Sequence, residues 1–210
     1  MRIKVCGMTK LEQIRQLNEI GIEFAGFIFY PKSPRYVKKF NLSAIDLKRE
    51  KMQISRVGVF VNERSEDVLK TVDHWRLDMV QLHGDETPKY CEQISNHVTT
   101  IKAFRIGEGE NVDWKINPYQ ACVDMFLFDT VGVHYGGTGQ QFDWSLIGNA
   151  RILKPYFLSG GIGPEDTKAV KEFAATQKNL FAVDVNSKFE LMPGVKDMDK
   201  VREFRGRLRD

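Results

Sequence analysis

Eight short apolar runs, rich in β-branched and aromatic residues, recur at fairly even intervals from one end of the chain to the other. They span residues 3–6, 24–29, 57–61, 79–83, 100–104, 125–129, 156–159 and 181–185. Near-continuous apolar runs of this length are typical of strands covered on both faces, as the strands of a parallel sheet are. The sequence therefore predicts eight strands of one parallel sheet.

Helix-like segments lie between these runs. Thr9 and Glu12 have the spacing of a capping box, which predicts a helix with Thr9 as its N-cap that stops at Gly21. Pro164, followed by two acidic residues, marks a second helix start. Strands alternating with helices favour an α/β fold, and eight βα units fit a closed (βα)8 TIM barrel. We expect residues 1–210 to form a single domain of this kind, although about 250 residues is more usual. A doubly wound open sheet is the alternative.

Charge and cysteine content exclude several classes of protein. The chain has 31 basic and 28 acidic residues, mixed along its length, so no nucleic-acid partner is expected. No apolar run approaches the roughly 20 residues that cross a membrane, and no apolar signal segment precedes the first strand. The three cysteines lack metal-type spacing, so we expect neither a disulfide framework nor a metal site, and Cys91 and Cys122 are interpreted as structural. Free thiols suit a reducing compartment, and the predicted location is the cytoplasm.

Cys6 ends the first predicted strand, and its side chain is expected at the mouth of the barrel, near a helix start. Backbone N–H groups at a helix start favour an anion, so the thiol pKa of about 8.5 is expected to fall there. Such a thiol is usable as a base or as a nucleophile. The competing interpretation is a small buried hydrophobe, which is the role of most free cysteines.

Asp129 ends the sixth predicted strand, after an apolar run. A partly desolvated carboxyl at that edge suits a general acid, whereas the plainer interpretation is a cap for the following turn. In a ring of eight strands, the first and sixth are three steps apart. Cys6 and Asp129 are therefore expected to face each other across the mouth, with room for a substrate between an acid and a base.

Glycines and small polar residues follow the last two predicted strands, where barrels usually bind phosphate. Gly160 and Gly161 join the seventh strand to a helix start, and Asn186 and Ser187 follow the eighth. Glycine lets backbone N–H groups approach an anion closely, although tight turns also need it. We expect a phosphorylated small molecule to bind here.

Three further side chains are candidates for substrate contact. Arg35 lies in a proline-stiffened loop after the second strand, where its guanidinium would hold a carboxylate with two hydrogen bonds. His83 and Asp184 end the fourth and eighth strands and are expected at the same mouth, to contact a hydroxyl or neighbouring backbone. Two loops are longer than a tight turn, 30–41 and 130–143, and the second is glycine-rich enough to act as a lid.

Several short motifs occur in a specific order along the chain. They are Lys4-Val5-Cys6-Gly7-Met8-Thr9, Ser33-Pro34-Arg35-Tyr36, Gln81-Leu82-His83-Gly84-Asp85, Gly136-Gly137-Thr138-Gly139, Leu158-Ser159-Gly160-Gly161-Ile162 and Pro193-Gly194-Val195-Lys196-Asp197. In this order and spacing the chain resembles, from end to end, the phosphoribosylanthranilate isomerase family of tryptophan biosynthesis.

The resemblance implies a βα barrel and an Amadori rearrangement without metal or organic cofactor. The implied substrate is N-(5-phosphoribosyl)anthranilate, and the implied product is 1-(2-carboxyphenylamino)-1-deoxyribulose 5-phosphate. Asp129 matches the general acid that protonates the ring oxygen, and Cys6 matches the base that removes the C2′ proton. Arg35 matches the residue that engages the anthranilate carboxylate.

Two positions depart from the family pattern. Lys188 replaces a common glycine after the eighth strand, and Gln140 stands where a lysine often follows Gly-Thr-Gly. The alternatives are another phosphosugar barrel, of the histidine-pathway isomerase or indole-glycerol-phosphate synthase type, and an inactive barrel that only binds a phosphorylated ligand. The first type would carry aspartate where Cys6 stands. A monomer is favoured because no motif argues for a dimer.

Overall fold

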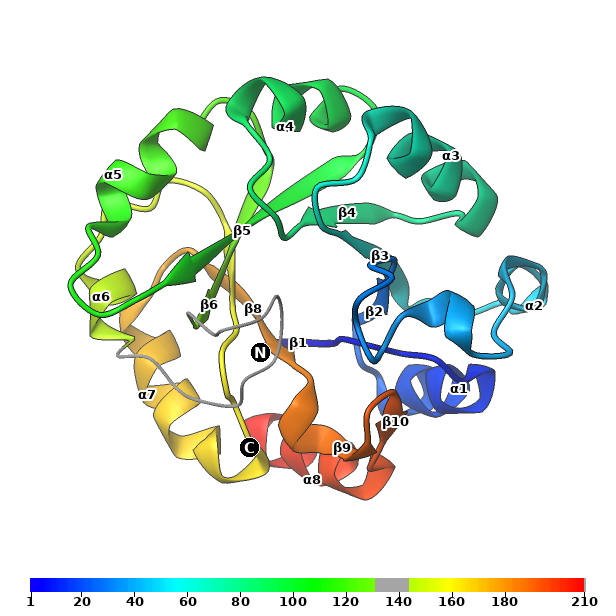
Figure 1. Cartoon of the computed structure of the whole chain (residues 1–210). Coiled ribbons are helices and arrows are strands. Elements are labelled where there is room, and N and C mark those ends of the chain that lie inside the picture. Colours follow the sequence, from blue (N-terminus) through cyan, green and yellow to red (C-terminus); the bar gives the residue numbers. More distant parts are fainter. Residues whose placement is uncertain (131–143, 210) are drawn as a thin grey trace.

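The computed structural model describes residues 1–130 and 144–209. Eight parallel strands close into a barrel in the order of the sequence, β1 to β8, which confirms the predicted (βα)8 TIM barrel and rules out the open sheet (Figure 1). The strands are β1 Arg2–Val5, β2 Phe24–Ile28, β3 Ser55–Phe60, β4 Met79–Leu82, β5 Thr99–Ile106, β6 Met125–Thr130, β7 Tyr156–Leu158 and β8 Leu180–Val185. Each predicted run overlaps one observed strand.

Helices surround the barrel as an outer ring (Figure 1). They are α1 Leu11–Ile20, α2 Ala44–Arg49, α3 Ser65–Trp75, α4 Pro88–Ser95, α5 Val112–Ile116, α6 Ser145–Gly148, α7 Thr167–Thr176 and α8 Met198–Arg209. A small antiparallel hairpin of β9 Glu190–Met192 and β10 Val195–Lys196 follows β8. This hairpin was not predicted, and it contributes to the site described below.

The first helix differs from its prediction at its start. Lys10, not Thr9, occupies the N-cap position, and no side chain caps the helix. The Thr9 hydroxyl donates instead to the carbonyl oxygen of Gly194, in the hairpin, so a long-range contact outcompetes the local cap. The end of the helix is as predicted, because Gly21 adopts a left-handed φ of 78°.

The inside of the barrel has an apolar layer below a polar one. Alternate residues of each strand point inward. Toward the strand starts these residues form a separate apolar cluster, made up of Phe24, Val57, Met79, Ile101, Ala103, Leu127, Phe157 and Ala182. Toward the strand ends the inward residues are largely polar. The larger core cluster lies outside this one and includes apolar residues of the helices as well as the strands.

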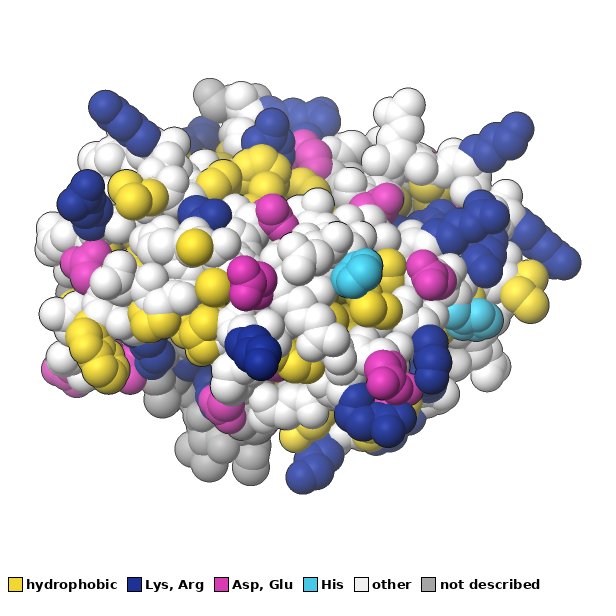
Figure 2. Space-filling model, turned by 90° about the horizontal axis from the view of Figure 1, so that it is seen from above, with side chains coloured by type: hydrophobic (Ala, Val, Ile, Leu, Met, Phe, Trp, Pro, Cys, Tyr) yellow, Lys and Arg dark blue, Asp and Glu magenta, His cyan; other side chains and the backbone are white. Residues whose placement is uncertain are grey.

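The outer surface carries charges of both signs. On the face drawn in Figure 2, basic side chains are interspersed with acidic ones and with small apolar areas. Within residues 1–130 and 144–209, no helix is long and apolar enough to cross a membrane.

Candidate active site

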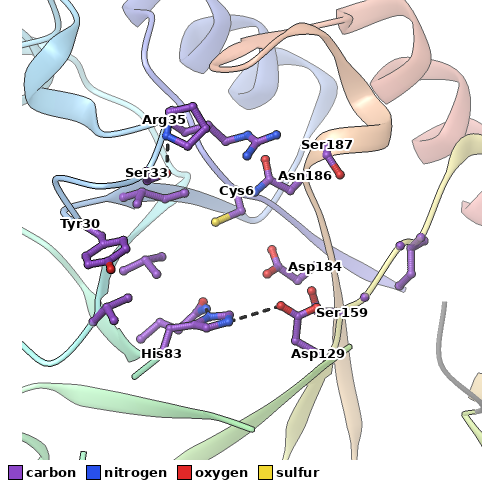
Figure 3. Close-up of a pocket in the computed structure, with 18 of the residues that line it drawn as sticks. Cys6, Tyr30, Ser33, Arg35, His83, Asp129, Ser159, Asp184, Asn186 and Ser187 are labelled. Carbon is purple, nitrogen blue, oxygen red and sulfur yellow. Dashed lines mark hydrogen bonds and ion pairs between the residues drawn. The ribbon is translucent and has the colours of Figure 1, made fainter. Parts of the chain in front are cut away.

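A cavity of about 480 Å³ opens at the end of the barrel where the strands finish. It brings together every side chain and glycine predicted from the sequence to act on a substrate (Figure 3). These are Cys6, Arg35, His83, Asp129, Gly160, Gly161, Asp184, Asn186 and Ser187. Cys6 and Asp129 come from strands three steps apart around the ring, as the predicted order requires.

Cys6 follows the last residue of β1, and its backbone N–H donates to Val185 of β8 at 2.9 Å. The side chain is 5% exposed and lines the cavity. It fits because its neighbour on β2 is glycine: a Cβ on Gly26 would lie 2.9 Å from the Cys6 sulfur. The predicted lowering of the thiol pKa is wrong. Burial raises the pKa of Cys6, against the opposing effect of Lys4, and α1 begins five residues later.

Lys4 lies below Cys6 on the inward face of β1 and is fully buried. Its ammonium donates to Asp184 Oδ1 on β8 at 2.9 Å and also interacts with the Cys6 sulfur. Burial opposes the charge on Lys4, but these two partners outweigh it and raise the pKa of Lys4. For Asp184, burial raises the pKa and Lys4 only partly offsets it. Because both groups are held at 2.9 Å inside the barrel, we interpret them as an ion pair at neutral pH.

Asp129 lies beside His83, with Asp129 Oδ2 3.3 Å from His83 Nε2 (Figure 3). On the other side of the ring, His83 Nδ1 is 2.6 Å from the Gln81 side-chain amide nitrogen. This contact fixes the orientation of the imidazole ring, so that Nε2 faces Asp129. Gln81 and His83 therefore position the Asp129 carboxyl at the cavity wall.

Arg35 is almost fully buried, and its loop places it at the cavity. Its Nε and Nη2 atoms donate to the carboxylate of Glu190 at 2.7–3.0 Å. A guanidinium has a second edge, formed by Nη1 and Nη2, which this contact does not use. Arg35 thus combines an internal ion pair with an edge that remains available to a ligand.

The predicted phosphate end of the cavity consists of the backbone segments that follow β7, at Gly160 and Gly161, and β8, at Asn186 and Ser187. Gly160 and Gly161 have φ values of 95° and 69°, a region that side chains other than hydrogen disfavour. A 3-10 turn, Pro164–Asp166, precedes α7, so the predicted helix start is a turn first and a helix from Thr167. Lys188 lies 3.9 Å from Glu165 and is not among the residues that line the cavity.

Of the two long loops expected at the mouth, the structure describes residues 30–41 but only the first residue of 130–143. Tyr30, Ser33 and Pro34 of the first loop line the cavity beside Arg35. The predicted lid, with Gln140, lies almost wholly outside the described residues. In the part of the chain that is described, no group of three or more His, Cys, Asp or Glu side chains could hold a metal ion.

Five polar residues of the site escaped the sequence interpretation: Lys4, Gln81, Ser159, Glu190 and Lys196. The first three carried a signal that was available. Lys4 and Gln81 each lie two residues before a recognised residue at a strand end, Cys6 and His83, and residues two apart along a strand share a face. Ser159 directly precedes Gly160, just after the end of β7. Glu190 lies in the unpredicted hairpin and carried no comparable signal. Lys196 lies there too, within the Pro193–Asp197 motif, but the sequence interpretation assigned it no role.

A closed (βα)8 barrel with a thiol, a carboxyl and glycine turns at the same mouth is typical of enzymes that act by acid–base chemistry on small phosphorylated molecules. The family model described as N-(5′-phosphoribosyl)anthranilate (PRA) isomerase matches residues 3–206. The chain therefore belongs to that family. This membership confirms the predicted enzyme class, a phosphoribosylanthranilate isomerase of tryptophan biosynthesis.

Individual relatives agree with this result over more than nine-tenths of their lengths. The chain is 39% identical over 205 residues to N-(5′-phosphoribosyl)anthranilate isomerase of Parabacteroides distasonis, covering 97% of this chain and 91% of the relative. It superposes with a TM-score of 0.81 and 34% identity on monomers of the dimeric enzyme from Thermotoga maritima. The same values hold for a phosphoribosyl anthranilate isomerase in complex with reduced 1-(o-carboxyphenylamino)-1-deoxyribulose 5-phosphate. Both superpositions cover 100% of this chain and 98% of the other.

Proposed function

We propose that this cavity converts N-(5-phosphoribosyl)anthranilate by two proton transfers, with Asp129 as the acid and Cys6 as the base. The observation that carries the proposal is the placement of a buried thiol and a buried carboxyl in one cavity, on strands three apart, with glycine turns at its edge. Such a pair suits proton transfer at two separate atoms of one substrate.

The first step opens the ribose ring. Asp129 gives its proton to the ring oxygen while the lone pair of the anthranilate nitrogen forms the C1′=N bond of a Schiff base. The thiolate of Cys6 then removes the C2′ proton, and the electrons of that bond produce an enolamine. Tautomerisation, in which the 2′-hydroxyl loses a proton and C1′ gains one, gives the ketone with no covalent bond to sulfur. The substrate nitrogen accepts and returns the electrons, so these steps require no cofactor.

The surrounding residues prepare the two groups for these steps. Burial and the nearby Asp184 disfavour the thiolate, whereas Lys4 and Lys196 favour it, so the negative charge has cationic neighbours when it forms. His83, fixed by Gln81, holds the Asp129 carboxyl. Asp184 is held by Lys4 and contacts a substrate hydroxyl in our proposal.

The ends of the substrate are assigned to the two ends of the cavity. We assign the anthranilate carboxylate to the free edge of Arg35, because planar two-point contact suits a carboxylate. The phosphate is assigned to the backbone of Gly160 and Gly161 with Asn186 and Ser187, because left-handed glycines expose N–H groups to an anion.

The proposed function is tested by following anthranilate fluorescence in purified protein with EDTA present. Loss of the substrate signal, with formation of the ketone product, is expected. Tight binding of the product analogue without turnover would contradict the proposal and favour a binding protein.

We further propose that residues 1–210 act as one barrel domain in the cytoplasm. The three free cysteines, with no disulfide among them, support a reducing compartment. A monomer is proposed for the purified chain, although a relative is dimeric. Sedimentation at micromolar concentration tests this, and a mass twice that of the chain would contradict it.

A further inference from the structure

The carboxylate of Glu190 accepts hydrogen bonds from two cationic side chains, Arg35 and Lys196. It accepts from Arg35 Nε at 2.9 and 3.0 Å, from Arg35 Nη2 at 2.7 Å and from Lys196 Nζ at 2.7 Å. The backbone N–H of Gly194 adds a further bond at 3.0 Å. The Glu190 side chain is 4% exposed, so these bonds replace nearly all of its solvent. Glu190 therefore ties the loop that carries Arg35 to the β9–β10 hairpin.

Lys196 extends this connection to the other end of the cavity. Its ammonium donates to Asn186 Oδ1 at 2.7 Å and to the Asn186 carbonyl at 3.3 Å, in addition to Glu190. Its backbone is clamped by the Gln13 amide, which donates at 2.6 Å and accepts at 3.0 Å. The turn after β8 is thereby anchored to α1 through one fully buried side chain.

The contacts at Gly7 show how closely Arg35, at the proposed carboxylate end of the cavity, and Asn186, at the proposed phosphate end, approach Cys6. A Cβ at Gly7 would lie 2.7 Å from Arg35 Cδ and 3.0 Å from Asn186 Oδ1. Arg35 and Asn186 thus both pack against the residue that follows Cys6. Both side chains therefore lie directly beside the backbone at Gly7, next to the proposed base.

We propose that Glu190 and Lys196 are positioning residues that set the spacing between the carboxylate-binding edge of Arg35 and the phosphate-binding turn at Asn186. Glu190 takes the Nε–Nη2 edge of Arg35 and leaves the Nη1–Nη2 edge directed to the substrate. Lys196 fixes Asn186 relative to Glu190. Selectivity for a ligand with both a carboxylate and a phosphate therefore depends on this hairpin. The inference rests on the proposed function for its ligand.

Measurements of ligand binding test the proposed positioning role without requiring turnover. The probes are the reduced product analogue with an o-carboxyphenylamino group, its phenylamino counterpart without the carboxylate, and inorganic phosphate as competitor. Binding is measured by calorimetry for the wild type, Glu190→Gln and Lys196→Met. If the wild type binds neither analogue, the proposed function fails. If it binds both equally, the assignment of Arg35 fails, and the proposed selectivity fails with it.

The two variants have different expected results. Glu190→Gln frees Arg35 to rotate, so the preference for the carboxylate analogue falls at least about tenfold, the loss of one charged hydrogen bond. Lys196→Met releases Asn186, so both analogues and inorganic phosphate weaken together, by about fivefold or more. An unchanged preference in Glu190→Gln, or phosphate competition of wild-type strength in Lys196→Met, would overturn the proposal.

A matched control separates positioning from stability. Glu23 pairs with Arg205 at the opposite end of the barrel, at 2.5 Å and largely out of solvent. Glu23→Gln is expected to lower the melting temperature while leaving the ligand preference unchanged. Should Glu190→Gln fail to fold, Gln13→Leu loosens the same hairpin without removing a charge, and its preference must fall as well. A wild-type preference in Gln13→Leu would then count against the inference.

Discussion

The character of Cys6 is set by the residues beside and below it in the barrel. Lys4 shares its inward face of β1, and Gly26 leaves the space that the sulfur occupies. The expected influence of a helix start is absent because α1 begins only at Leu11. Cys6 is thus held as a buried thiol beside a cation, and it becomes a base only when the proton leaves.

The raised pKa of Cys6 predicts how its alkylation depends on pH. Below the pKa, the thiolate fraction and the rate of modification by iodoacetamide rise about tenfold for each pH unit. Because burial raises the pKa of Cys6 above the ordinary thiol value, no plateau is expected between pH 7 and 9. Modification is quantified by mass spectrometry, with the fully buried Cys91 as a monitor of unfolding. A plateau below pH 8 would show a thiol with a lowered pKa.

Substitution of Gly26 is expected to slow catalysis by displacing Cys6, although Gly26 itself is not proposed to contact the substrate. A Cβ there would lie 2.9 Å from the Cys6 sulfur and 3.0 Å from its Cα, so Gly26→Ala must displace the base. We expect kcat to fall at least about tenfold, because misplacement of a reacting group by an ångström is costly.

Gly206→Ala is the matched control, because no atom outside its own helix lies within 4 Å of the added Cβ. It is expected to keep the wild-type kcat and to gain about 0.4–1 kcal/mol of stability. Equal rates in the two variants would refute the steric explanation.

The β9–β10 hairpin is the element that joins the separate parts of the mouth. It supplies Glu190 and Lys196, and the carbonyl of Gly194 accepts from Thr9. The same contact explains why the predicted capping box did not form: the Thr9 hydroxyl is used by a residue far along the sequence. A local pattern could not reveal this competition.

Acid titration tests the ion pairs of this hairpin. Burial opposes the charge on Glu190, but hydrogen bonds from Arg35 and Lys196 outweigh it and lower the pKa of Glu190. A lowered pKa contributes stability that is present above the unfolded value near 4.5 and is lost as the pH falls through the folded value. The stability difference between wild type and Glu190→Gln, from urea unfolding, should therefore shrink below pH 4.5. A difference that stays constant from pH 6 to pH 3 would show that the carboxylate is not stabilised.

At the scale of the whole molecule, the residues that stabilise the barrel and the residues proposed to act on the substrate lie in different layers of its interior. The apolar layer around Phe157 closes the interior near the strand starts, and the polar layer forms the cavity near the strand ends. Phe24 and Phe181 pack against Phe157, with ring centres 5.5 Å away in each case.

Phe157→Ala tests this separation. Removal of a fully buried ring from the lower layer is expected to cost about 3–5 kcal/mol of unfolding free energy. The kcat of the folded fraction should stay within about twofold of the wild type, because the cavity is lined by Ser159, which follows the end of β7, and not by Phe157. A large loss of kcat at a temperature where the variant is folded would show that the layers are coupled.

The regular part of the molecule could be predicted from its sequence, and the long-range part could not. Each strand could be predicted from its own run of apolar residues. Because the strands of a barrel all end at the same edge, the side chains at their ends were expected to lie together: Cys6, His83, Asp129 and Asp184. The hairpin and its hydrogen bond to Thr9 depend on residues 185 positions apart, which no local pattern reports. The raised pKa of Cys6 was also missed, because it depends chiefly on burial of the thiol, which the position of Cys6 in the chain does not give. The opposing cation, Lys4, lies two residues away and could have been recognised from the strand pattern.

Single-turnover conversion by Cys6→Ser and Asp129→Asn tests the central claim most directly. Each folded variant is mixed in excess with N-(5-phosphoribosyl)anthranilate, and the loss of substrate fluorescence is timed. The opposed acid and base predict a rate at least about 100-fold below the wild type in each variant, the usual contribution of a general acid or base. A wild-type rate in either variant would contradict the role assigned to that residue.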